Sequence, residues 1–184
     1  MPKFLVILLI LNFYDPAFSS VKDKIISQMK LSNTLSFNFI QTIGEKTENG
    51  SCIIKYSKKI FCEYIGSSKK IIVSNGKSLA IKIKNSGNYY LFPLKKTPLG
   101  LLLDKKYLIS KINDLEVRNI DNQFLAFKIF ENGSEINIFF DKENFNLTGW
   151  QTEDIYQNLV ITFISSVKIN QEIDDDIFIL PKNN

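Results

Sequence analysis

The segment Leu35-Ser36-Phe37-Asn38-Phe39 decides the fold of this 184-residue chain. Large apolar side chains occupy every second position of it, and a serine and an asparagine stand between them. Because successive side chains of a β-strand point to opposite faces, the segment predicts a strand with one apolar and one polar face. The same alternation recurs along most of the chain, which indicates a protein built mainly from β-strands.

Further strands are predicted wherever the alternation returns. They cover residues 50–56, 60–65, 70–74, 78–84, 88–92, 124–131, 134–141, 145–153 and 157–169. Turn signals such as Asn49-Gly50 and Asn75-Gly76 separate them. Nine or ten strands in chain order are typical of a strongly curved antiparallel sheet, a sandwich or a partly open barrel. In 157–169 neither face is polar, so parts of the sheet are expected to be covered on both sides.

Two regions break the strand pattern and favour helices. Ser20 and Asp23 fit a capping box, and apolar residues at helical spacing follow them, which predicts a helix of about three turns over residues 21–31. Thr97-Pro98 resembles the N-cap and first residue of a short helix ahead of an apolar turn. A second short helical piece is expected around residues 107–112.

The first 19 residues have the features of a secretory signal peptide. Met1-Pro2-Lys3 is a positively charged start, residues 4–11 are an unbroken apolar run, and Ala17-Phe18-Ser19 supplies the small residues that signal peptidase reads. A membrane anchor is the alternative, but the run is far shorter than the roughly 20 residues of a spanning helix. We therefore expect cleavage after Ser19 and one exported domain over residues 20–184.

The composition argues against several classes of function. The chain has no histidine, so it lacks histidine-based nucleophilic catalysis, the usual zinc ligands and a neutral-pH proton shuttle. Arg118 is the only arginine behind a net charge of +4, which argues against nucleic-acid binding. The acidic run 172–176 lacks the ligand spacing and glycine of a calcium loop and is expected to be a solvated turn. We expect no enzyme activity, no cofactor and no metal site.

Four Lys-Lys pairs lie at predicted turns or beside the central helix, at positions 58–59, 69–70, 95–96 and 105–106. The simplest interpretation is that they keep loops hydrated. For the pairs at 95–96 and 105–106 a second interpretation is equally open, in which they contact an acidic partner or anionic lipid head groups.

The two cysteines lie symmetrically about Ser57. If this stretch is a hairpin that turns near Ser57, then Cys52 and Cys62 oppose each other on two strands, and an oxidising compartment allows a disulfide. Directly opposed residues come close enough only in the non-hydrogen-bonded register, so two buried, reduced cysteines are the alternative.

The aromatic content of 15 Phe, 7 Tyr and 1 Trp has two explanations. One is a large solid core. The other is a curved sheet that is too wide for its own side chains to fill, which leaves a lined cavity under a helical cover. The residue pattern alone leaves both open.

Five motifs resemble those of the LolA-type periplasmic carriers of outer-membrane lipoproteins in Gram-negative bacteria, and together they cover nearly all of residues 20–184. In chain order they are Phe39-Ile40-Gln41 for the family's Phe-x-Gln, residues 50–64 for its first hairpin, residues 73–79 for its Val-Ser-Asp-Gly-Lys-Thr-Leu turn, Thr97-Pro98 with two following leucines for its central helix, and residues 141–163 with Trp150, Asp154, Gln157, Thr162 and Phe163 for its late run. The resemblance implies a mainly β (α+β) fold, in which a curved sheet forms an incomplete β-barrel with an N-terminal helix and short central helices as a lid.

The resemblance also implies a function. Such a carrier is a periplasmic monomer that holds the acyl chains of triacylated lipoproteins in a hydrophobic cavity. It takes them from an inner-membrane lipoprotein-releasing ABC transporter complex to an outer-membrane lipoprotein acceptor. The implied cavity residues are Phe37, Phe39, Ile54, Tyr56, Ile60, Tyr64, Leu79 and Ile81, and the implied lid contacts are Leu99, Leu102 and Leu103. The alternative is a non-catalytic interaction or sensor module of the cell envelope with the same curved sheet.

The chain departs from the family at two positions. The family's arginine-proline falls at Tyr56-Ser57, and its cavity tryptophan or phenylalanine falls at Cys62. In the family that arginine is thought to hold the lid through hydrogen bonds to backbone groups, whereas a tyrosine offers one hydroxyl donor. The same alignment puts Cys52 and Cys62 on the inward face, so a disulfide between them would line the cavity.

Overall fold

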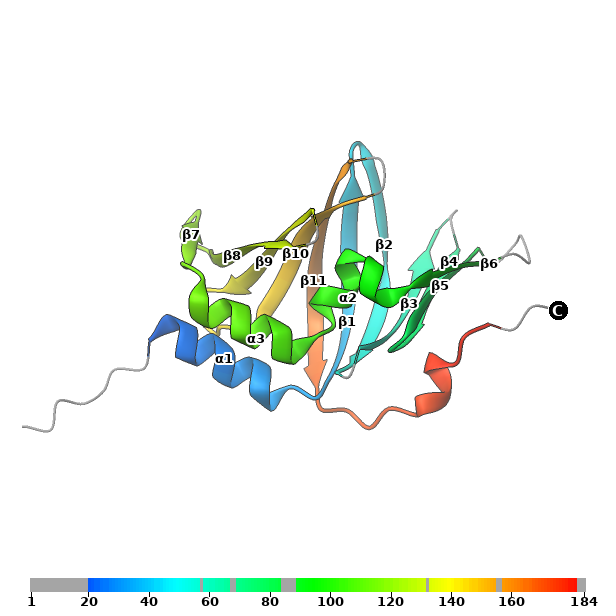
Figure 1. Ribbon diagram of the computed structural model, residues 1–184, viewed down its shortest axis with the longest axis horizontal. Coiled ribbons are helices and arrows are strands. Elements are labelled where there is room, and N and C mark those ends of the chain that lie inside the picture. The colour runs from blue at the N-terminus through cyan, green and yellow to red at the C-terminus, as the bar shows by residue number, and fades with distance from the viewer. Residues whose placement is uncertain are drawn as a thin grey trace, which may run out of the picture.

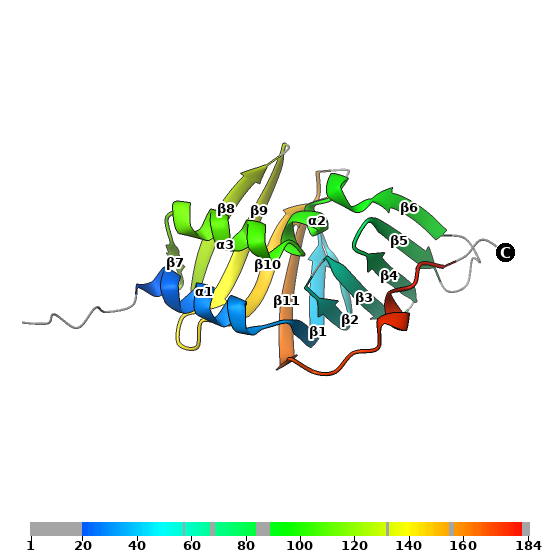
Figure 2. The same cartoon turned by 60° about the horizontal axis from the view of Figure 1, so that its bottom comes forward.

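The computed structural model describes residues 20–56, 58–66, 69–83, 89–131, 133–154 and 157–181. These residues form one antiparallel sheet of eleven strands that is strongly curved and not closed, with helices on its concave face (Figures 1 and 2). The predicted mainly β fold with an incomplete barrel is therefore confirmed. The predicted signal peptide over 1–19 and the predicted turn centre at Ser57 lie outside the described residues.

The sheet consists of two meanders that meet at one junction. The strands are β1 (Thr34–Ile43), β2 (Lys46–Lys55), β3 (Lys59–Ile65), β4 (Lys70–Asn75), β5 (Ser78–Ile83), β6 (Tyr89–Pro93), β7 (Arg118–Ile120), β8 (Phe124–Glu131), β9 (Ser134–Asp141), β10 (Leu147–Glu153) and β11 (Leu159–Ile169). Their order across the sheet is β6-β5-β4-β3-β2-β1-β11-β10-β9-β8-β7. Only β1 and β11 are neighbours without being consecutive in the chain, so this pair joins the two meanders.

The helices follow the predicted signals. They are α1 (Val21–Leu31), α2 (Pro98–Leu102) and α3 (Lys105–Asp114), with the short 3-10 helices η1 (Leu94–Lys96) and η2 (Asp175–Phe178). Ser20 and Asp23 make the predicted capping box on α1, and the Thr97 hydroxyl caps α2. Within the described ranges, no helix combines the length and hydropathy that crossing a bilayer requires.

The structure differs from the predicted strand pattern in two places. β7 was not predicted, because three residues are too few for an alternation to show. The predicted turn at Asn49-Gly50 is wrong: both residues lie inside β2, and the hairpin turns at Gly44, whose φ is +57°. A Cβ at Gly50 would collide with the backbone oxygen of Glu63 and with the ring of Phe39. This glycine therefore marks a close approach of chains rather than a turn.

Two clusters of buried side chains lie on the concave face. In the first, α1 and α3 pack on β8 and β9, and Ile112, Phe127 and Ile138 are fully buried. In the second, η1 and α2 cover the inner faces of β1 to β5, with Phe37, Phe39 and other apolar residues between them. We call β8 and β9 with α1 and α3 the helix-covered half, and β1 to β6 with η1 and α2 the lid-covered half.

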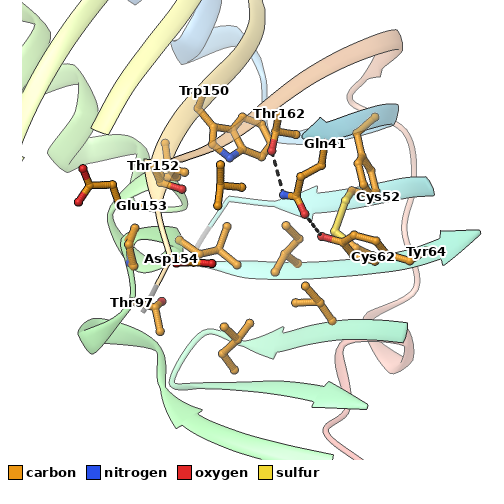
Figure 3. Close-up of a pocket in the computed structure, with 18 residues that line it drawn as sticks. Gln41, Cys52, Cys62, Tyr64, Thr97, Trp150, Thr152, Glu153, Asp154 and Thr162 are labelled. Atoms are coloured by element: carbon orange, nitrogen blue, oxygen red, sulfur yellow. Dashed lines mark hydrogen bonds between the residues drawn. A yellow bond between two sulfur atoms is a disulfide. The ribbon is translucent and has the colours of Figure 1, made fainter. Parts of the chain in front are cut away.

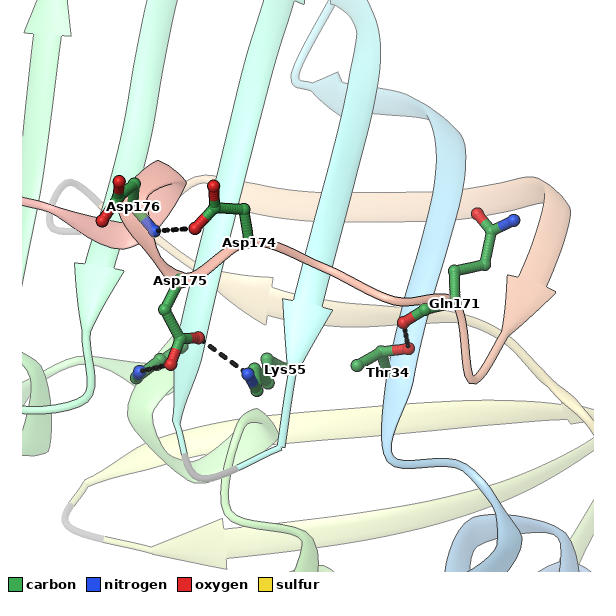
Figure 4. A network of polar contacts seen from close by, with 7 residues as sticks. Thr34, Lys55, Gln171, Asp174, Asp175 and Asp176 are labelled. Atoms are coloured by element: carbon green, nitrogen blue, oxygen red, sulfur yellow. Dashed lines mark hydrogen bonds and ion pairs between the residues drawn. The ribbon is translucent and has the colours of Figure 1, made fainter.

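The C-terminal segment covers the convex face of the lid-covered half (Figure 4). The Thr34 hydroxyl donates to the backbone oxygen of Gln171 (2.9 Å), and η2 then packs beside β3 and β4. Asp175 pairs with Lys55 (2.8 Å) and Lys59 (3.2 Å). Phe178 is buried there. The acidic run, expected as a solvated turn, keeps its carboxylates exposed but forms the 3-10 helix that fixes this segment to the sheet.

Candidate functional site

A cavity of about 230 Å³ lies between the lid-covered half of the sheet and α2 (Figure 3). Strands β1 to β5 form its wall, α2 forms its roof, and the adjoining ends of β10 and β11 form its rim. The lining residues are Phe39, Gln41, Cys52, Ile60, Cys62, Tyr64, Ile72, Leu79, Thr97, Pro98, Leu99, Leu102, Trp150, Thr152, Glu153, Asp154, Val160 and Thr162. Most of the wall is apolar, and the polar side chains gather at the rim.

The structure brings half of the eight proposed wall residues into this cavity. Those that line it are Phe39, Ile60, Tyr64 and Leu79. Ile54 and Tyr56 line a smaller adjoining space of about 30 Å³, which shares Trp150, Leu99 and Leu102 with the first. Burial raises the pKa of Tyr56 to about 12, so its hydroxyl is protonated at neutral pH.

The other two proposed wall residues lie outside both spaces. Phe37 is buried in the same cluster, and its ring meets that of Trp150 edge-on with the centroids 6.2 Å apart. Ile81 is half-buried on β5 and lines neither space. Phe37 therefore packs beside the cavity, on the same face of β1 as Phe39, without lining it.

The roof is a single short helix that lies directly on η1. The Thr97 hydroxyl accepts a hydrogen bond from the N–H of Gly100 (3.2 Å) and so starts the helix. Leu99 and Leu102 line both spaces, and Leu103 lines the smaller one. A Cβ at Gly100 would collide with the backbone oxygen of Leu94, so the absence of a side chain allows the close contact between α2 and η1.

Two polar contacts fasten the lid to the rest of the protein. Lys58, in the β2–β3 turn, pairs with Asp104 at 2.8 Å. Lys105 donates to the backbone oxygen of Ser32 (2.9 Å), and its ammonium lies 5.0 Å from the centre of the Tyr56 ring. Tyr56, where the family resemblance puts an arginine, therefore lies against a cation from the first residue of α3. This contact could not be predicted from local sequence patterns, because it joins residues far apart in the chain.

Burial and hydrogen bonds act in opposite directions on Asp104. Burial raises the pKa of this carboxyl, but the hydrogen bonds from the Lys58 ammonium and the N–H of Tyr107 outweigh it and hold the pKa below the ordinary value. Burial also lowers the pKa of the Lys105 ammonium. The Asp104 carboxylate that faces Lys58 is therefore charged at neutral pH.

One chain of hydrogen bonds crosses the apolar wall (Figure 3). The Tyr64 hydroxyl donates to Oε1 of Gln41 (3.1 Å), and Nε2 of Gln41 donates to the Thr162 hydroxyl (3.0 Å). It links β3, β1 and β11, which are not consecutive in the chain. Gln41 and Thr162 occur in the motifs that carry the family resemblance, but they were not assigned to the cavity from sequence.

A buried ion pair supports this chain from behind Tyr64. Glu48 is only 6% exposed and pairs with Lys70 and with Lys46, the latter at 2.8 Å. The Lys70 ammonium also lies 4.0 Å from the centre of the Tyr64 ring. Burial raises the pKa of Glu48, but the hydrogen bonds and charges of Lys46 and Lys70 lower it by more than burial raises it. This carboxylate is therefore charged. Burial and the nearby charge of Glu48 raise the pKa of Tyr64 well above its ordinary value.

A disulfide joins Cys52 and Cys62 in the cavity wall. The two residues are directly opposed on β2 and β3, and their Cα atoms are 4.1 Å apart. This short separation is typical of a non-hydrogen-bonded antiparallel pair. The disulfide therefore lies in the wall at the place where the family resemblance puts an aromatic side chain.

The arrangement is suited to holding an apolar chain. The polar groups of the wall bond to each other, and the described residues contain no cluster of three Cys, Asp or Glu side chains that could hold a metal ion. Apolar walls with a few fixed polar groups are typical of small-molecule and lipid sites.

Comparison with known proteins gives one family and a group of similar folds. The family model for the outer membrane lipoprotein carrier protein LolA matches residues 30–180. No curated protein matches the chain significantly. A LolA superfamily protein from Nitrosomonas europaea is similar in structure, with 10% identity and a TM-score of 0.49 over 87% of this chain and 96% of that chain.

Two further solved structures are similar to this chain at low identity. An outer-membrane lipoprotein-sorting protein domain from Vibrio parahaemolyticus has 9% identity and a TM-score of 0.46, over 84% of this chain and 94% of that chain. A chain of the MucA/MucB complex from Pseudomonas aeruginosa has 8% identity and a TM-score of 0.49, over 88% of this chain and 61% of that chain. This chain therefore spans less than two thirds of the length of the latter structure.

Proposed function

The chain belongs to the family of outer membrane lipoprotein carrier proteins, LolA, and from this premise we propose that it carries lipoproteins between two membranes with their acyl chains in the cavity beneath α2. Its family is one of binding and carrier proteins of the periplasm. As part of the same proposal, residues 1–19 direct export and residues 20–184 act as a monomer. The inner-membrane lipoprotein-releasing ABC transporter complex is the donor, and an outer-membrane lipoprotein acceptor is the recipient.

The observation that carries the proposal is an apolar cavity with a small and weakly fastened roof. The wall belongs to a continuous sheet and is cross-linked by the Cys52–Cys62 disulfide. The roof is the five-residue helix α2, and two polar contacts follow it: the partly exposed ion pair between Lys58 and Asp104, and the hydrogen bond from Lys105 to the backbone oxygen of Ser32. Ion pairs with this exposure contribute about 1 kcal/mol or less, so the roof can move while the wall stays in place.

The energetics of acyl binding require such a roof. A lipoprotein with three acyl chains has roughly 45 methylenes, and burying each contributes about 0.8 kcal/mol, or about 35 kcal/mol in all. This exceeds the practical ceiling of about 20 kcal/mol for non-covalent binding and would prevent delivery. The carrier must therefore bury the chains incompletely.

The volume of the cavity leads to the same conclusion. An apolar cavity of about 150 Å³ takes up one benzene molecule, so 230 Å³ holds only part of one acyl chain while the roof is closed. Uptake therefore moves α2 outward and exposes Leu99, Leu102 and Leu103 to the ligand. Closing the empty roof buries the same leucines again, which offsets part of the binding free energy and keeps transfer near balance.

Binding of a fluorescent fatty acid to the purified protein, and its displacement by an unlabelled fatty acid, test the proposal. We expect saturable binding that Phe39→Glu abolishes, because a carboxylate in the wall is costly to desolvate beside an acyl chain. Phe163→Glu is the matched control, since Phe163 lies on the convex face and is 44% exposed. Lipoprotein release from membranes should likewise be lost in Phe39→Glu and kept in Phe163→Glu. Unchanged release by a folded Phe39→Glu protein would refute the assignment of the cavity.

One observation favours the second candidate, an envelope module that binds a protein partner without lipid. The convex face of β8 to β11 is not covered by η2, and Phe163 stacks there on Phe139 with the ring centroids 5.9 Å apart. Saturable displacement of the fatty acid distinguishes the two, because a module of this kind needs no acyl cavity.

A further inference from the structure

The basic residues of the chain are unevenly distributed. Between Tyr64 and Leu103 the sequence contains seven lysines and neither aspartate nor glutamate, although the whole chain has 23 basic and 19 acidic residues. The lysines are at positions 69, 70, 77, 82, 84, 95 and 96. This stretch forms β4, β5, β6, η1 and α2, so one end of the sheet and the lid carry the positive charge together.

Three of these lysines lie side by side next to the lid. The N–H of Leu94 donates to the backbone oxygen of Lys77 (3.0 Å), which brings Lys77 close to Lys95 and Lys96. All three are exposed. Within the described residues their ammonium groups make no hydrogen bond or ion pair, in contrast to Lys58, which pairs with Asp104.

The neighbouring strand β6 exposes large apolar side chains. It is an outer edge of the sheet, at the opposite end from β7 (Figure 2). Tyr90, Leu91 and Phe92 are 58%, 53% and 40% exposed. Because side chains alternate along a strand, Tyr90 and Phe92 point to one face and Leu91 to the other. The strand thus offers apolar groups on both sides of a thin edge rather than one flat apolar face.

This combination fits a lipid surface better than a protein surface. Aromatic and apolar side chains settle at the head-group level of a bilayer, and lysines beside them are attracted to anionic lipids. A thin edge with apolar groups on both sides can enter the head groups, whereas a protein partner packs best on a single continuous face. The stretch itself contains no acidic residue, and the acidic side chain that shares a hollow with Lys95 and Lys96 is Glu131 of β8, which pairs with Lys111.

We propose that the β6–η1 edge, formed by Tyr90, Leu91 and Phe92 with Lys77, Lys95 and Lys96, docks on the surface of an anionic phospholipid bilayer. The proposal rests on the carrier function and deepens it. The lid begins directly after Lys96, so docking places α2 and the cavity rim beside the membrane that an acyl chain leaves or enters.

Co-sedimentation of the purified protein with lipid vesicles tests the proposal. Vesicles of equal parts phosphatidylglycerol and phosphatidylcholine should bind the protein more tightly than pure phosphatidylcholine vesicles, and added salt should weaken the binding because it screens surface charge. Replacing Lys77, Lys95 and Lys96 together by Gln should lower the partition constant for the anionic vesicles about 100-fold. Replacing Tyr90 and Phe92 by Ser should weaken binding at every salt concentration.

A matched triple variant with the same change of net charge is the control. Lys30, Lys142 and Lys168 are exposed and lie on other elements, so replacing them by Gln should change the partition constant no more than about threefold. Equal losses in the two triple variants, or no preference of the unaltered protein for anionic vesicles, would overturn the proposal. Binding to an acidic protein in place of the vesicles would overturn it as well.

The failure of this proposal is distinguishable from failure of the carrier function. The triple variant at 77, 95 and 96 should bind the fluorescent fatty acid as tightly as the unaltered protein does, since none of the three lysines lines the cavity. Phe39→Glu should lose binding of the fluorescent fatty acid but still bind the vesicles. If the unaltered protein binds the fatty acid but not the vesicles, the proposed docking surface is wrong and the proposed cavity stands.

Discussion

The two halves of this molecule share one continuous sheet but differ in how its concave face is filled. In the helix-covered half, α1 and α3 have 11 and 10 residues and leave Ile112, Phe127 and Ile138 fully buried. In the lid-covered half, the cover consists of the five-residue α2 and the three-residue η1, and a cavity of about 230 Å³ remains beneath it. The half with the longer helices is thus filled, and the half with the short helices stays partly hollow. A filled half gives the fold its stability, and a hollow half gives it capacity for a ligand.

The largest expected effect separates the halves by their tolerance to truncation. Phe127→Ala should lower the free energy of unfolding by about 3–5 kcal/mol, because the fully buried ring leaves a cavity that its neighbours cannot fill. Leu99→Ala should cost clearly less, since this half-buried side chain already borders empty space. Urea unfolding of both variants measures the difference. Equal losses would mean that the two halves are packed alike.

The disulfide provides the next test, because it cross-links only the lid-covered half. Replacing Cys52 and Cys62 together by Ala should lower the free energy of unfolding by about 2 kcal/mol, as expected for a cross-link that closes a short loop. Unfolding of the unaltered protein in a reducing buffer should show the same loss. A loss in the variant without one in the reducing buffer would point to packing of the sulfurs instead of the cross-link.

A substitution at Gly100 should loosen the roof without touching the wall. In Gly100→Ala the new methyl group collides with the backbone oxygen of Leu94, so α2 must move away from η1 at a cost of about 1–3 kcal/mol. We expect tighter binding of the fluorescent fatty acid, because less free energy is then needed to open the roof. Weaker binding would show that the contacts of α2 with the ligand contribute more free energy than moving α2 outward costs.

The smallest effect concerns the ion pair that fastens the lid. Asp104→Asn keeps the cap of α3 but removes the charge facing Lys58, and should cost less than about 1 kcal/mol near neutral pH. Because the folded-state pKa of Asp104 is lowered, its contribution is complete above the ordinary value of 3.8 and is lost as the pH falls through the folded pKa. Unfolding of both proteins at several pH values measures it. A difference that persists in strong acid would exclude the ion pair as its source.

The parts of the fold that were predicted from sequence rest on local patterns. The alternation at Leu35 to Phe39 fixes which face of β1 is buried, and the Ser20 capping box and Thr97-Pro98 fix two helix starts. Gly50 misled the turn prediction, because Asn-Gly has the composition of a tight turn whereas the need for glycine comes from β3 and Phe39. A contact with another strand leaves no trace in the local pattern.

The candidate site was predicted only in outline for the same reason. The apolar wall follows from strand alternation and the family motifs, so Phe39, Ile60 and Leu79 line the cavity. The fastening of Lys105 to Ser32 joins residues 73 positions apart, and the bond between Gln41 and Thr162 spans 121 positions. Such pairs depend on how distant segments meet in space. The contact between the Lys105 ammonium and the ring of Tyr56 is another pair of this kind.

The C-terminal segment has a mechanical consequence for the cavity on the other side of the sheet. It leaves β11, bonds to Thr34 at the start of β1, pairs with β2 and β3 through Asp175, and packs on β3 and β4 through η2, where Phe178 is buried. The segment therefore bridges several strands across the convex face of the curved sheet. If the proposed carrier function holds, this segment should resist flattening of the sheet when α2 moves outward, so the width of the opening is limited from the convex face.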